Sequence, residues 1–290
     1  VVANNENCDS CINKTTVFPQ SIGLASTWNL DLVYKEATAI SDEARALANT
    51  LNNSRYLNFW NPMINIARDP RWGRTQEGYG EDPFLVSKIA VEYIKGLQGK
   101  DEKYLKAIAS PKHFVANNVD GDRHFTNSKI DDKILRDYYL PAFRSSIIEG
   151  NAQGLMSAYN ALNGVPCSGN TFLLNDILRG EWGFKGHVVS DCGAVYNIHA
   201  NHFFTETPHQ GVALALKSGT DMNCGGQYEK HLYEAYEIGL VREIDIDTSL
   251  KRILRSRFLL GMFDHPSLVP FSKIPVDVID SKKHRLLAKE

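Results

Sequence analysis

The segment Gly186–Cys192, "GHVVSDC", indicates how this chain folds. Its adjacent valines, Val188 and Val189, are β-branched residues that favour a buried strand, and the apolar run stops abruptly at Asp191. A charged side chain at the end of a buried strand occupies a defined position in the fold. Asp191 is either the N-cap of a following helix or a carboxylate that performs chemistry. This segment taken alone favours the N-cap, although the residues after it lack a helical charge pattern.

Segments of strand and helix character alternate along the chain. Strands are expected at residues 58–66, 105–114, 153–160 and 186–191, with a short strand end at 220–224. Helices are expected at residues 26–49, 82–96, 131–150, 171–183, 209–219, 230–238 and 246–260. Asp82 is expected to cap the second helix, because Pro83 follows it in the first turn. Strands that alternate with helices of about ten or more residues predict parallel βα units.

The candidate functional residues lie where the expected strands end. They are Trp60, Lys112, His113, Tyr159, Asp191 and Cys224. In a (β/α)8 barrel the active site gathers at the carboxyl ends of the strands, so the sequence predicts an α/β fold of the TIM-barrel type. Only about five strands can be counted against the eight of a closed barrel, so we expect a barrel that is incomplete at its N-terminus. The alternative, a doubly wound open sheet, carries a G-x-G-x-x-G fingerprint, which this sequence lacks.

The composition limits the classes of partner. The chain has 290 residues, of which 43% are hydrophobic, and a formal net charge of −2, which suits one barrel-sized core. The near-neutral charge gives no basic surface for nucleic acid or an anionic membrane. No apolar run approaches the ~20 residues that span a bilayer. We therefore expect neither nucleic acid nor a membrane as a partner.

Cysteines and glycosylation sequons bear on the cellular compartment. Cys8 and Cys11 form a C-x-x-C pair, but the second pair of a zinc site is missing, so we expect no metal. The sequons that begin at Asn13 and Asn52 are compatible with secretion. The first residues lack the charged start and long apolar core of a signal peptide. The expected location is secreted or periplasmic.

Asp191 has the chemistry of a glycosidase nucleophile. A carboxylate suits this role because it stabilises an oxocarbenium-like transition state and then bonds to the anomeric carbon. Lys112 and His113 interrupt an apolar strand and offer hydrogen-bond donors to adjacent sugar hydroxyls. Together these residues indicate a sugar-processing site.

Three further side chains have both a binding and a structural interpretation. Arg74 offers a planar fork for a pair of hydroxyls, or it forms an ion pair with Glu77 or Glu81. Trp60 and Tyr159 offer flat apolar faces to the C–H side of a sugar ring. Their alternative is packing in the core, which is the commoner fate of an aromatic side chain.

Four motifs together resemble the N-terminal catalytic domain of glycoside hydrolase family 3. They are "NPMINIARDPRWGRTQEGYGEDP", "PKHF", "MSAYN" and "VVSDCGAV". The resemblance extends over nearly the whole chain and implies a retaining mechanism, in which the aspartate of the S-D-x-G motif, here Asp191, is the nucleophile. It also implies that the glycone is bound by the residues at the matching positions, Arg74, Lys112, His113, Met156 and Tyr159.

The residues next to the nucleophile are similar to the β-xylosidase branch of this family. Many family β-glucosidases carry tryptophan directly after the nucleophile, where this chain has Cys192, and a second cysteine, Cys224, lies in "DMNCGG". Both cysteines follow neighbouring strands in the expected barrel order, so we expect the two thiols to be close enough to bond, with Cα atoms within ~7 Å. The bond would form a wall that admits xylose, which lacks a C6 hydroxymethyl group, and crowds glucose. β-Glucosidase activity and α-L-arabinofuranosidase activity stay open as alternatives.

The resemblance also divides the chain into two parts. Residues 1–262 correspond to the barrel domain, and residues 263–290 to a linker and the start of a following α/β sandwich domain of the same parent chain. The acid/base of this branch is a glutamate on that sandwich domain, and an acidic glycone ligand precedes Val1, so both are expected outside this chain. Asp122 and His124 occupy the loop that carries the acid of another branch, but its Gly-His-Gly signature is absent, so neither is assigned.

The expected function follows from these residues. The resemblance implies an exo-acting retaining glycosidase that needs no cofactor and releases terminal β-D-xylose or glucose from plant cell-wall oligosaccharides and glycosides. The alternative from another class is a non-catalytic barrel fragment that binds sugar, because the acid lies outside the chain.

Overall fold

The computed structural model describes residues 14–290, so Cys8, Cys11 and Asn13 lie outside the described range. The α-helices are α2 (Ser21–Ala25), α3 (Leu30–Leu51), α4 (Pro83–Gln98), α5 (Asp132–Ile134), α6 (Pro141–Ile148), α7 (Ala194–Ala200), α8 (Pro208–Ser218), α9 (Gln227–Glu237), α10 (Glu243–Leu259) and α11 (Lys282–Leu287). Two π-helical segments are η3 (Leu135–Tyr139) and η5 (Phe172–Glu181). Every helix expected from the sequence is present, with α5, η3 and α6 forming the one expected at 131–150. None of the helices within residues 14–290 is long and apolar enough to cross a membrane.

The strands are short, and their pairing is mostly parallel. They are β1 (Asn58–Phe59), β2 (Ile108–Ala109), β3 (Asn127–Ser128), β4 (Gly154–Ser157), β5 (Ala161–Leu162), β6 (Val165–Pro166) and β7 (His187–Ser190). β1 pairs with β2 and β4 with β7, both in parallel, whereas β3, β5 and β6 form a separate small sheet. Single parallel bridges extend these pairs, and they join Met63 to Lys112, Phe114 to Ser157, and Val189 to Met222. The neighbours therefore follow chain order, as parallel βα units predict.

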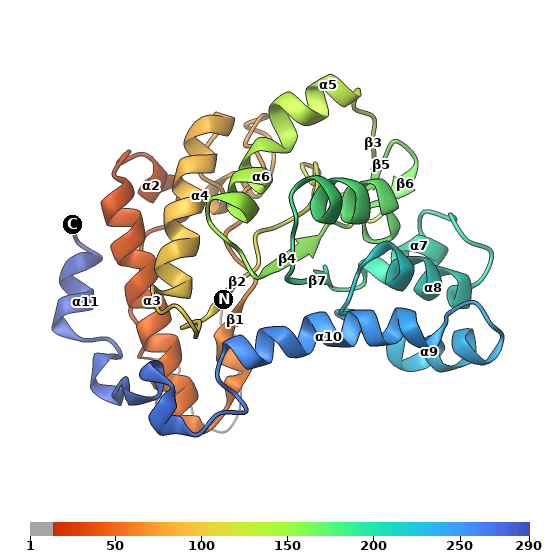
Figure 1. The fold of residues 1–290 in the computed structure, drawn as a ribbon. Helices are drawn as coiled ribbons and strands as arrows, with labels where there is room; N and C mark the ends of the chain where they lie inside the picture. The colour runs from red at the N-terminus through yellow and green to blue at the C-terminus, as the bar shows by residue number, and fades with distance from the viewer. Residues whose placement is uncertain (1–13) are drawn as a thin grey trace.

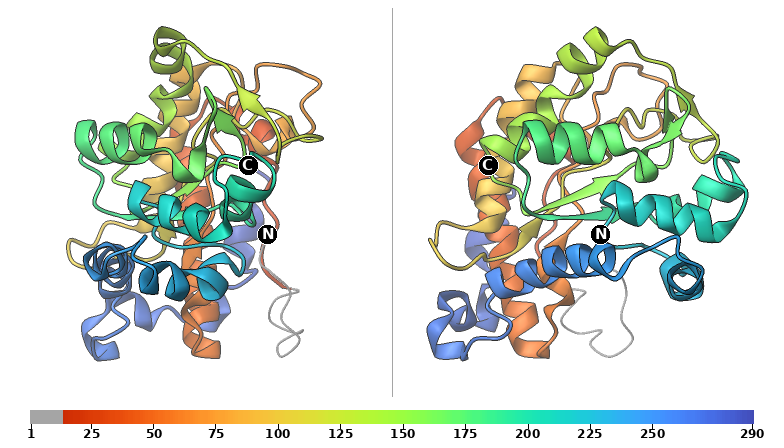
Figure 2. Two further views of the ribbon diagram at one scale, coloured as in Figure 1. Left: turned by 90° about the vertical axis from the view of Figure 1, so that its right-hand side faces the viewer. Right: turned by 45° about the vertical axis from the view of Figure 1, so that its right-hand side comes forward.

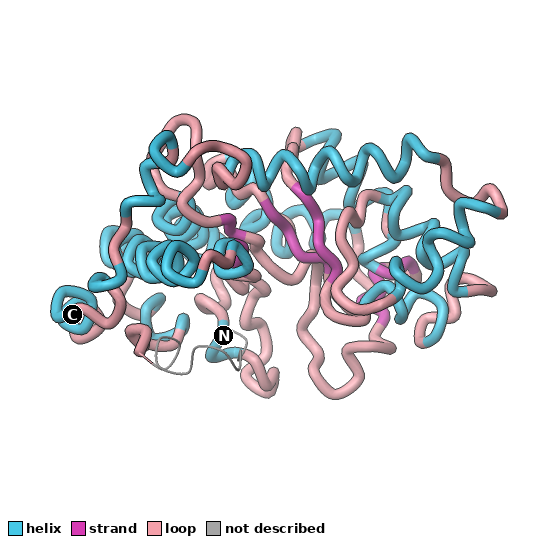
Figure 3. Tube along the Cα trace, turned by 90° about the horizontal axis from the view of Figure 1, so that it is seen from below, coloured by secondary structure: helices cyan, strands magenta, loops and turns pink. Residues whose placement is uncertain are grey.

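The sequence predicts a (β/α)8 barrel that is incomplete at its N-terminus, and residues 14–290 form short parallel strand pairs but no closed barrel. The parallel order is confirmed, but the strands expected at 58–66 and 105–114 are reduced to β1, β2 and single bridges. Pro62 and Pro111 interrupt them, because proline has no N–H to donate to a strand ladder. The architecture is mixed α/β, with the short strands between helices (Figure 3).

The helices pack on both sides of the strands. α3 and α4 lie side by side at one edge, and α7, α8 and α9 lie at the other (Figures 1 and 2). Val33 of α3 and Val86 of α4 are fully buried, and they belong to the same apolar core as Leu155 of β4. α4 begins as the sequence predicts, because Asp82 Oδ1 accepts a hydrogen bond from the Leu85 N–H at 2.6 Å. This packing holds the strand ends in fixed positions.

The last segment of the chain returns to α3. It contains the 3-10 turns η6 (Pro266–Leu268), η7 (Pro270–Lys273) and η8 (Val276–Val278), followed by α11. The buried His284 Nδ1 lies 2.7 Å from Glu43 Oε1, and Asn49 Nδ2 donates to the Phe271 carbonyl at 3.1 Å. Residues 263–290 are therefore packed on α3 rather than extended. That they begin another domain stays a prediction.

Glu36 of α3 makes the stability of the fold dependent on pH. It is 6% exposed, and burial raises the pKa of its carboxyl from 4.5 to about 7. A raised folded-state pKa means that the folded protein holds the proton more tightly than the unfolded chain, so the free energy of unfolding falls as pH rises from 4.5 to about 7. We expect Glu36→Gln to remove this loss and to stabilise the protein by about 3 kcal/mol at pH 8.

Urea unfolding of wild type and Glu36→Gln at pH 5 and pH 8 checks this expectation. The difference in free energy of unfolding should be small at pH 5 and large at pH 8. Glu229→Gln, an exposed change on α9, serves as the control. An equal difference at both pH values would show that Glu36 does not titrate as proposed.

Candidate active site

The centre of the site is the place where β4 and β7 end side by side. The register pairs Ser157 with Ser190, and the Asp191 N–H donates to the Ser157 carbonyl at 3.1 Å. This parallel ladder places Asp191 directly beyond the buried strand end. Its side chain is 12% exposed, so the carboxylate is largely removed from water but reachable.

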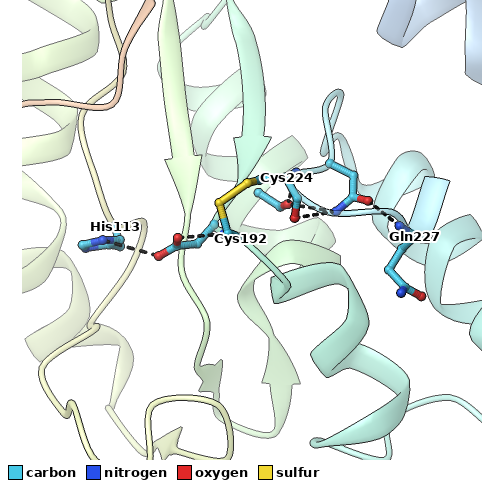
Figure 4. The surroundings of a disulfide bond; sticks show 7 residues. His113, Cys192, Cys224 and Gln227 are labelled. Atoms are coloured by element: carbon cyan, nitrogen blue, oxygen red, sulfur yellow. Dashed lines mark hydrogen bonds and ion pairs between the residues drawn. A yellow bond between two sulfur atoms is a disulfide. The ribbon is translucent and has the colours of Figure 1, made fainter. Parts of the chain in front are cut away.

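Three groups surround the Asp191 carboxylate. Oδ1 accepts a hydrogen bond from the Cys192 N–H at 2.8 Å, and Oδ2 lies 3.4 Å from His113 Nε2. The Tyr159 hydroxyl also hydrogen-bonds to the carboxylate. Figure 4 shows His113 on one side of this region and the Cys192–Cys224 pair on the other. The Cys192 N–H and the Tyr159 hydroxyl thus fix the orientation of the carboxylate, and His113 lies beside it.

The electrostatic balance at Asp191 combines burial with nearby positive charge. Burial raises the pKa of the carboxyl above its ordinary value, and the opposing effects come from the Cys192 N–H, Tyr159, Lys112 and Arg74. Burial also raises the pKa of Tyr159 to about 12, so its hydroxyl keeps its proton and donates. A desolvated carboxylate next to cations is suited to nucleophilic attack on an electron-poor carbon.

The N-cap interpretation of Asp191 is wrong. A helix does follow, but its N-cap is Gly193, which has a φ of 88°. This is the left-handed region that glycine adopts without steric cost. The Asp191 side chain accepts only from the adjacent Cys192 N–H among the hydrogen bonds that define this turn. The carboxylate is therefore not used to cap α7.

Arg74 forms the ion pair that the sequence allowed, and its binding of sugar hydroxyls stays a prediction. Its Nε and Nη2 donate to Glu77 Oε1 and Oε2 at 2.9 and 2.7 Å, which confirms the ion pair. Its third nitrogen, Nη1, donates to His113 Nε2 at 3.2 Å. Lys112 is partly buried, and burial lowers its pKa. The predicted cations therefore surround the nucleophile, with the Arg74 guanidinium fixed by Glu77.

Asn65 and Arg123 are site residues that the sequence reasoning missed. Asn65 Oδ1 accepts from both the His113 N–H and His113 Nδ1, at 2.8 and 2.9 Å. The Arg123 guanidinium lies over the Tyr159 ring, 5.5 Å from its centroid. Its Nε is buried and has no hydrogen-bond partner within residues 14–290. Asn65 lies inside the quoted motif that begins "NPMINIARDPRW". The sequence analysis assigned a binding role only to an arginine of this motif and not to its asparagine.

The loop after the Lys112–His113 strand packs against Tyr159. The His124 and Tyr159 rings meet edge to face with centroids 4.5 Å apart, and His124 Nδ1 is 2.9 Å from Asn197 Nδ2 of α7. His202 Nε2 donates to the Tyr159 carbonyl at 2.9 Å. These contacts fix the position of Tyr159 beside Asp191.

Cys192 and Cys224 form a disulfide with a Cα–Cα distance of 4.4 Å. This confirms the expected proximity. The loop that carries Cys224 is tied to the nucleophile segment a second time, because the Gly193 N–H donates to the Cys224 carbonyl at 2.8 Å. Among the described cysteines only Cys167 is free, and it is buried. The disulfide lies directly next to Asp191 in the chain and forms one boundary of the site (Figure 4).

Within residues 14–290, the side chains of Trp60 and Met156 form no hydrogen bond or ion pair with this cluster, although the Met156 backbone pairs with Pro111 and Phe114 on either side of Lys112–His113. Trp60 follows β1 and is 39% exposed. Met156 is 1% exposed; it lies opposite Val189 in the β4–β7 ladder. Their roles in sugar binding stay predictions. Within the described part of the chain, no group of His, Cys, Asp and Glu side chains is arranged to hold a metal ion.

The chain belongs to glycoside hydrolase family 3. Residues 6–256 match the glycosyl hydrolase family 3 N terminal domain. A xylan 1,4-beta-xylosidase of Xylanibacter ruminicola is 42% identical over 285 residues, which cover 93% of this chain and 33% of the relative. A beta-xylosidase/alpha-L-arabinofuranosidase 2 of Medicago sativa is 38% identical over 280 residues, 93% of this chain and 36% of the relative.

Solved structures give the same family. A GH3 exo-beta-xylosidase in complex with a xylobiose aziridine probe superposes with a TM-score of 0.91 at 32% identity, over 99% of this chain and 37% of that one. A beta-glucosidase from Listeria innocua in complex with glucose superposes with a TM-score of 0.85 at 29% identity, over 95% of this chain and 37% of that one. The chain thus spans about a third of the length of these relatives.

Proposed function

We propose that the protein carrying this chain is a retaining exo-β-xylosidase with Asp191 as its nucleophile. The observation that carries the proposal is the buried Asp191 carboxylate at the end of β7, held between His113 and the Cys192–Cys224 disulfide. The names of the similar enzymes, xylan 1,4-beta-xylosidase and exo-beta-xylosidase, support the substrate class.

In the proposed reaction, Asp191 attacks the anomeric carbon of a terminal xylosyl residue. The bond to the leaving oxygen breaks, a glycosyl ester forms on Asp191, and water then hydrolyses this ester. The leaving oxygen takes a proton from an acid that we place on a following α/β sandwich domain, which begins within residues 263–290. Lys112, His113 and Arg74 bind hydroxyls of the sugar, while Tyr159 hydrogen-bonds to the carboxylate. Trp60 and Met156 line the same subsite.

The disulfide supports a preference for xylose. Cys192 adjoins the nucleophile, and Cys224 closes the loop against it. A rigid wall here leaves room for a pentose and crowds the C6 hydroxymethyl group of glucose.

A second candidate is β-glucosidase activity, favoured by the TM-score of 0.85 to a solved beta-glucosidase. The name of the Medicago relative suggests a third activity to test, α-L-arabinofuranosidase, with an α-L-arabinofuranoside as substrate.

We also infer the setting of this domain. Strands that are neighbours in space are paired in parallel and in chain order, from β1 through β2, β4 and β7 to the bridge at Met222. This order supports a complete (β/α)8 barrel in the parent protein. A disulfide persists in oxidising compartments, which supports a secreted or periplasmic location. The proposed partners are therefore a glycoside substrate and a following domain of the same chain.

The experiment is a comparison of aryl glycosides, using this chain joined to the domain that follows it. We expect the highest kcat/KM for the β-D-xyloside, a lower value for the β-D-glucoside, and loss of both in Asp191→Ala. A higher kcat/KM for the glucoside or the α-L-arabinofuranoside would transfer the proposal to that substrate. Sugar binding without hydrolysis would favour the non-catalytic module.

The positive charge of Lys112 should shift the acid limb of the pH profile to lower pH. Asp191 must be ionised to attack, and burial raises its pKa while Lys112 lowers it, so activity falls as pH drops through this pKa. Removing the ammonium in Lys112→Met should move the acid limb of kcat/KM to higher pH by about one unit. The exposed Lys251→Met on α10 is the control. An unshifted acid limb in Lys112→Met would show that another group controls it.

A further inference from the structure

Asn65 forms a closed hydrogen-bonded frame around His113. Both side chains are 2% exposed. Asn65 Oδ1 accepts from the His113 backbone N–H at 2.8 Å, and Asn65 Nδ2 donates to the His113 carbonyl at 2.9 Å. The side-chain amide therefore pairs with residue 113 much as a neighbouring strand would.

This frame determines which way the amide points. A backbone N–H can only donate and a backbone C=O can only accept, so the oxygen of Asn65 must face the N–H and its nitrogen must face the carbonyl. The same oxygen lies 2.9 Å from His113 Nδ1. An amide oxygen only accepts. Nδ1 must therefore carry a proton.

The charges around His113 disfavour a second proton on the ring. Burial lowers the pKa of His113 well below its ordinary value, and Arg74, Lys112 and Arg123 lower it further. The opposing group is Asp191, whose Oδ2 is 3.4 Å from Nε2. In a neutral ring with a proton on Nδ1, Nε2 carries a lone pair. Arg74 Nη1 donates to that nitrogen at 3.2 Å.

We propose that Asn65 is a positioning residue that holds His113 as the neutral Nδ1–H tautomer, so that Nε2 faces the sugar site as a hydrogen-bond acceptor. The proposal deepens the proposed function and rests on it for the nature of the ligand. It corrects the sequence expectation that His113 is a donor to the sugar. Nε2 binds a donor, either Arg74 or a sugar hydroxyl, and passes no proton to Asp191. The His113–Asp191 contact is then not an ion pair, and the carboxylate keeps its full charge for attack.

The test is the protonation state of the His113 ring nitrogens, read from 15N chemical shifts of the histidine-labelled chain between pH 5 and pH 8. The His113→Gln variant assigns the signals. We expect Nδ1 to be protonated and Nε2 to be unprotonated throughout. A protonated Nε2 in this range, in either the other tautomer or an imidazolium, overturns the proposal. This readout needs no catalysis, so failure of the proposed activity would be seen separately.

Asn65→Asp gives a second, independent reading. A carboxylate next to Nδ1 favours the imidazolium, so we expect the midpoint of His113 protonation to rise by at least about one pH unit. The matched control is Asn58→Asp, because Asn58 Nδ2 is 3.3 Å from Nε2 of a different buried histidine, His187, whose pKa burial lowers to about 4. That change should move the His187 signals and leave His113 unchanged.

An unaltered His113 titration in a folded Asn65→Asp protein contradicts the proposal, because a residue that only fills space would leave the ring protonation as it is. If the variant does not fold, as circular dichroism would show, the wild-type spectrum alone decides.

Discussion

Asp191→Ala should lower kcat/KM for an aryl β-xyloside by about four to six orders of magnitude, the range found when a single member of a catalytic triad is removed. In the proposed mechanism the carboxylate both stabilises the oxocarbenium-like transition state and forms the intermediate, so the substitution removes both contributions together. Asp191→Glu should retain little activity. The two carboxyls of a retaining enzyme lie about 5–5.5 Å apart, and one extra methylene misplaces the attacking oxygen.

The comparison between variants distinguishes chemistry from folding. The Asp191 backbone N–H still pairs with Ser157 in the alanine variant, so the β4–β7 ladder should persist and circular dichroism should match the wild type. Added azide should restore turnover of a substrate with a good leaving group in Asp191→Ala, because the small anion takes the place of the missing carboxylate. A folded Asp191→Ala protein with near wild-type activity contradicts the assignment.

Removing the disulfide should produce the largest loss of stability. Cys192 and Cys224 have a sequence separation of 32 residues, and closing a loop of this length stabilises a fold by about 4 kcal/mol in the chain-entropy account. The double variant Cys192→Ser/Cys224→Ser should therefore unfold at much lower urea concentration. Reduced wild type is the control and should behave like the double variant. Equal stability of the oxidised wild type and the double variant would contradict this expectation.

The same double variant tests the proposed wall against glucose. With the disulfide absent, the loop around Cys224 is held mainly by hydrogen bonds, such as that from the Cys224 N–H to Ser190 Oγ at 3.0 Å. The ratio of glucoside to xyloside kcat/KM should rise about tenfold, a typical effect of one small group in a pocket. An unchanged ratio would place the discrimination between sugars elsewhere in the site.

Patterns that act over a few residues predicted the elements well. The Asp82–Pro83 start of α4 follows from local capping chemistry, and it is present as expected. The positions of the strand ends followed from the alternation of strand and helix, which is why Asp191 and His113 could be placed at one site. Strand lengths were overestimated, because the interruptions at Pro62 and Pro111 remove ladder donors inside otherwise apolar segments.

Contacts between distant segments were harder to predict. Asn65 and His113 are 48 residues apart, and nothing local to Asn65 shows that its amide completes the ladder of another segment. Arg123 lies in a polar loop where an arginine is ordinarily solvated, yet it covers the Tyr159 ring. The local sequence favoured an N-cap for Asp191, but the left-handed Gly193 supplied the turn instead. Each of these depends on packing partners that the sequence pattern does not identify.

The most direct test of the central claim is the mass of the protein after reaction with a 2-deoxy-2-fluoro-β-D-xyloside that carries an acidic phenol as leaving group. The fluorine slows both steps, and the good leaving group needs little acid assistance, so the glycosyl ester accumulates. The chain joined to the proposed following domain should gain one 2-fluoroxylosyl group per molecule. Peptide mapping should place this group on Asp191, and Asp191→Ala should gain none. An adduct on a different carboxylate of the folded protein would contradict the account.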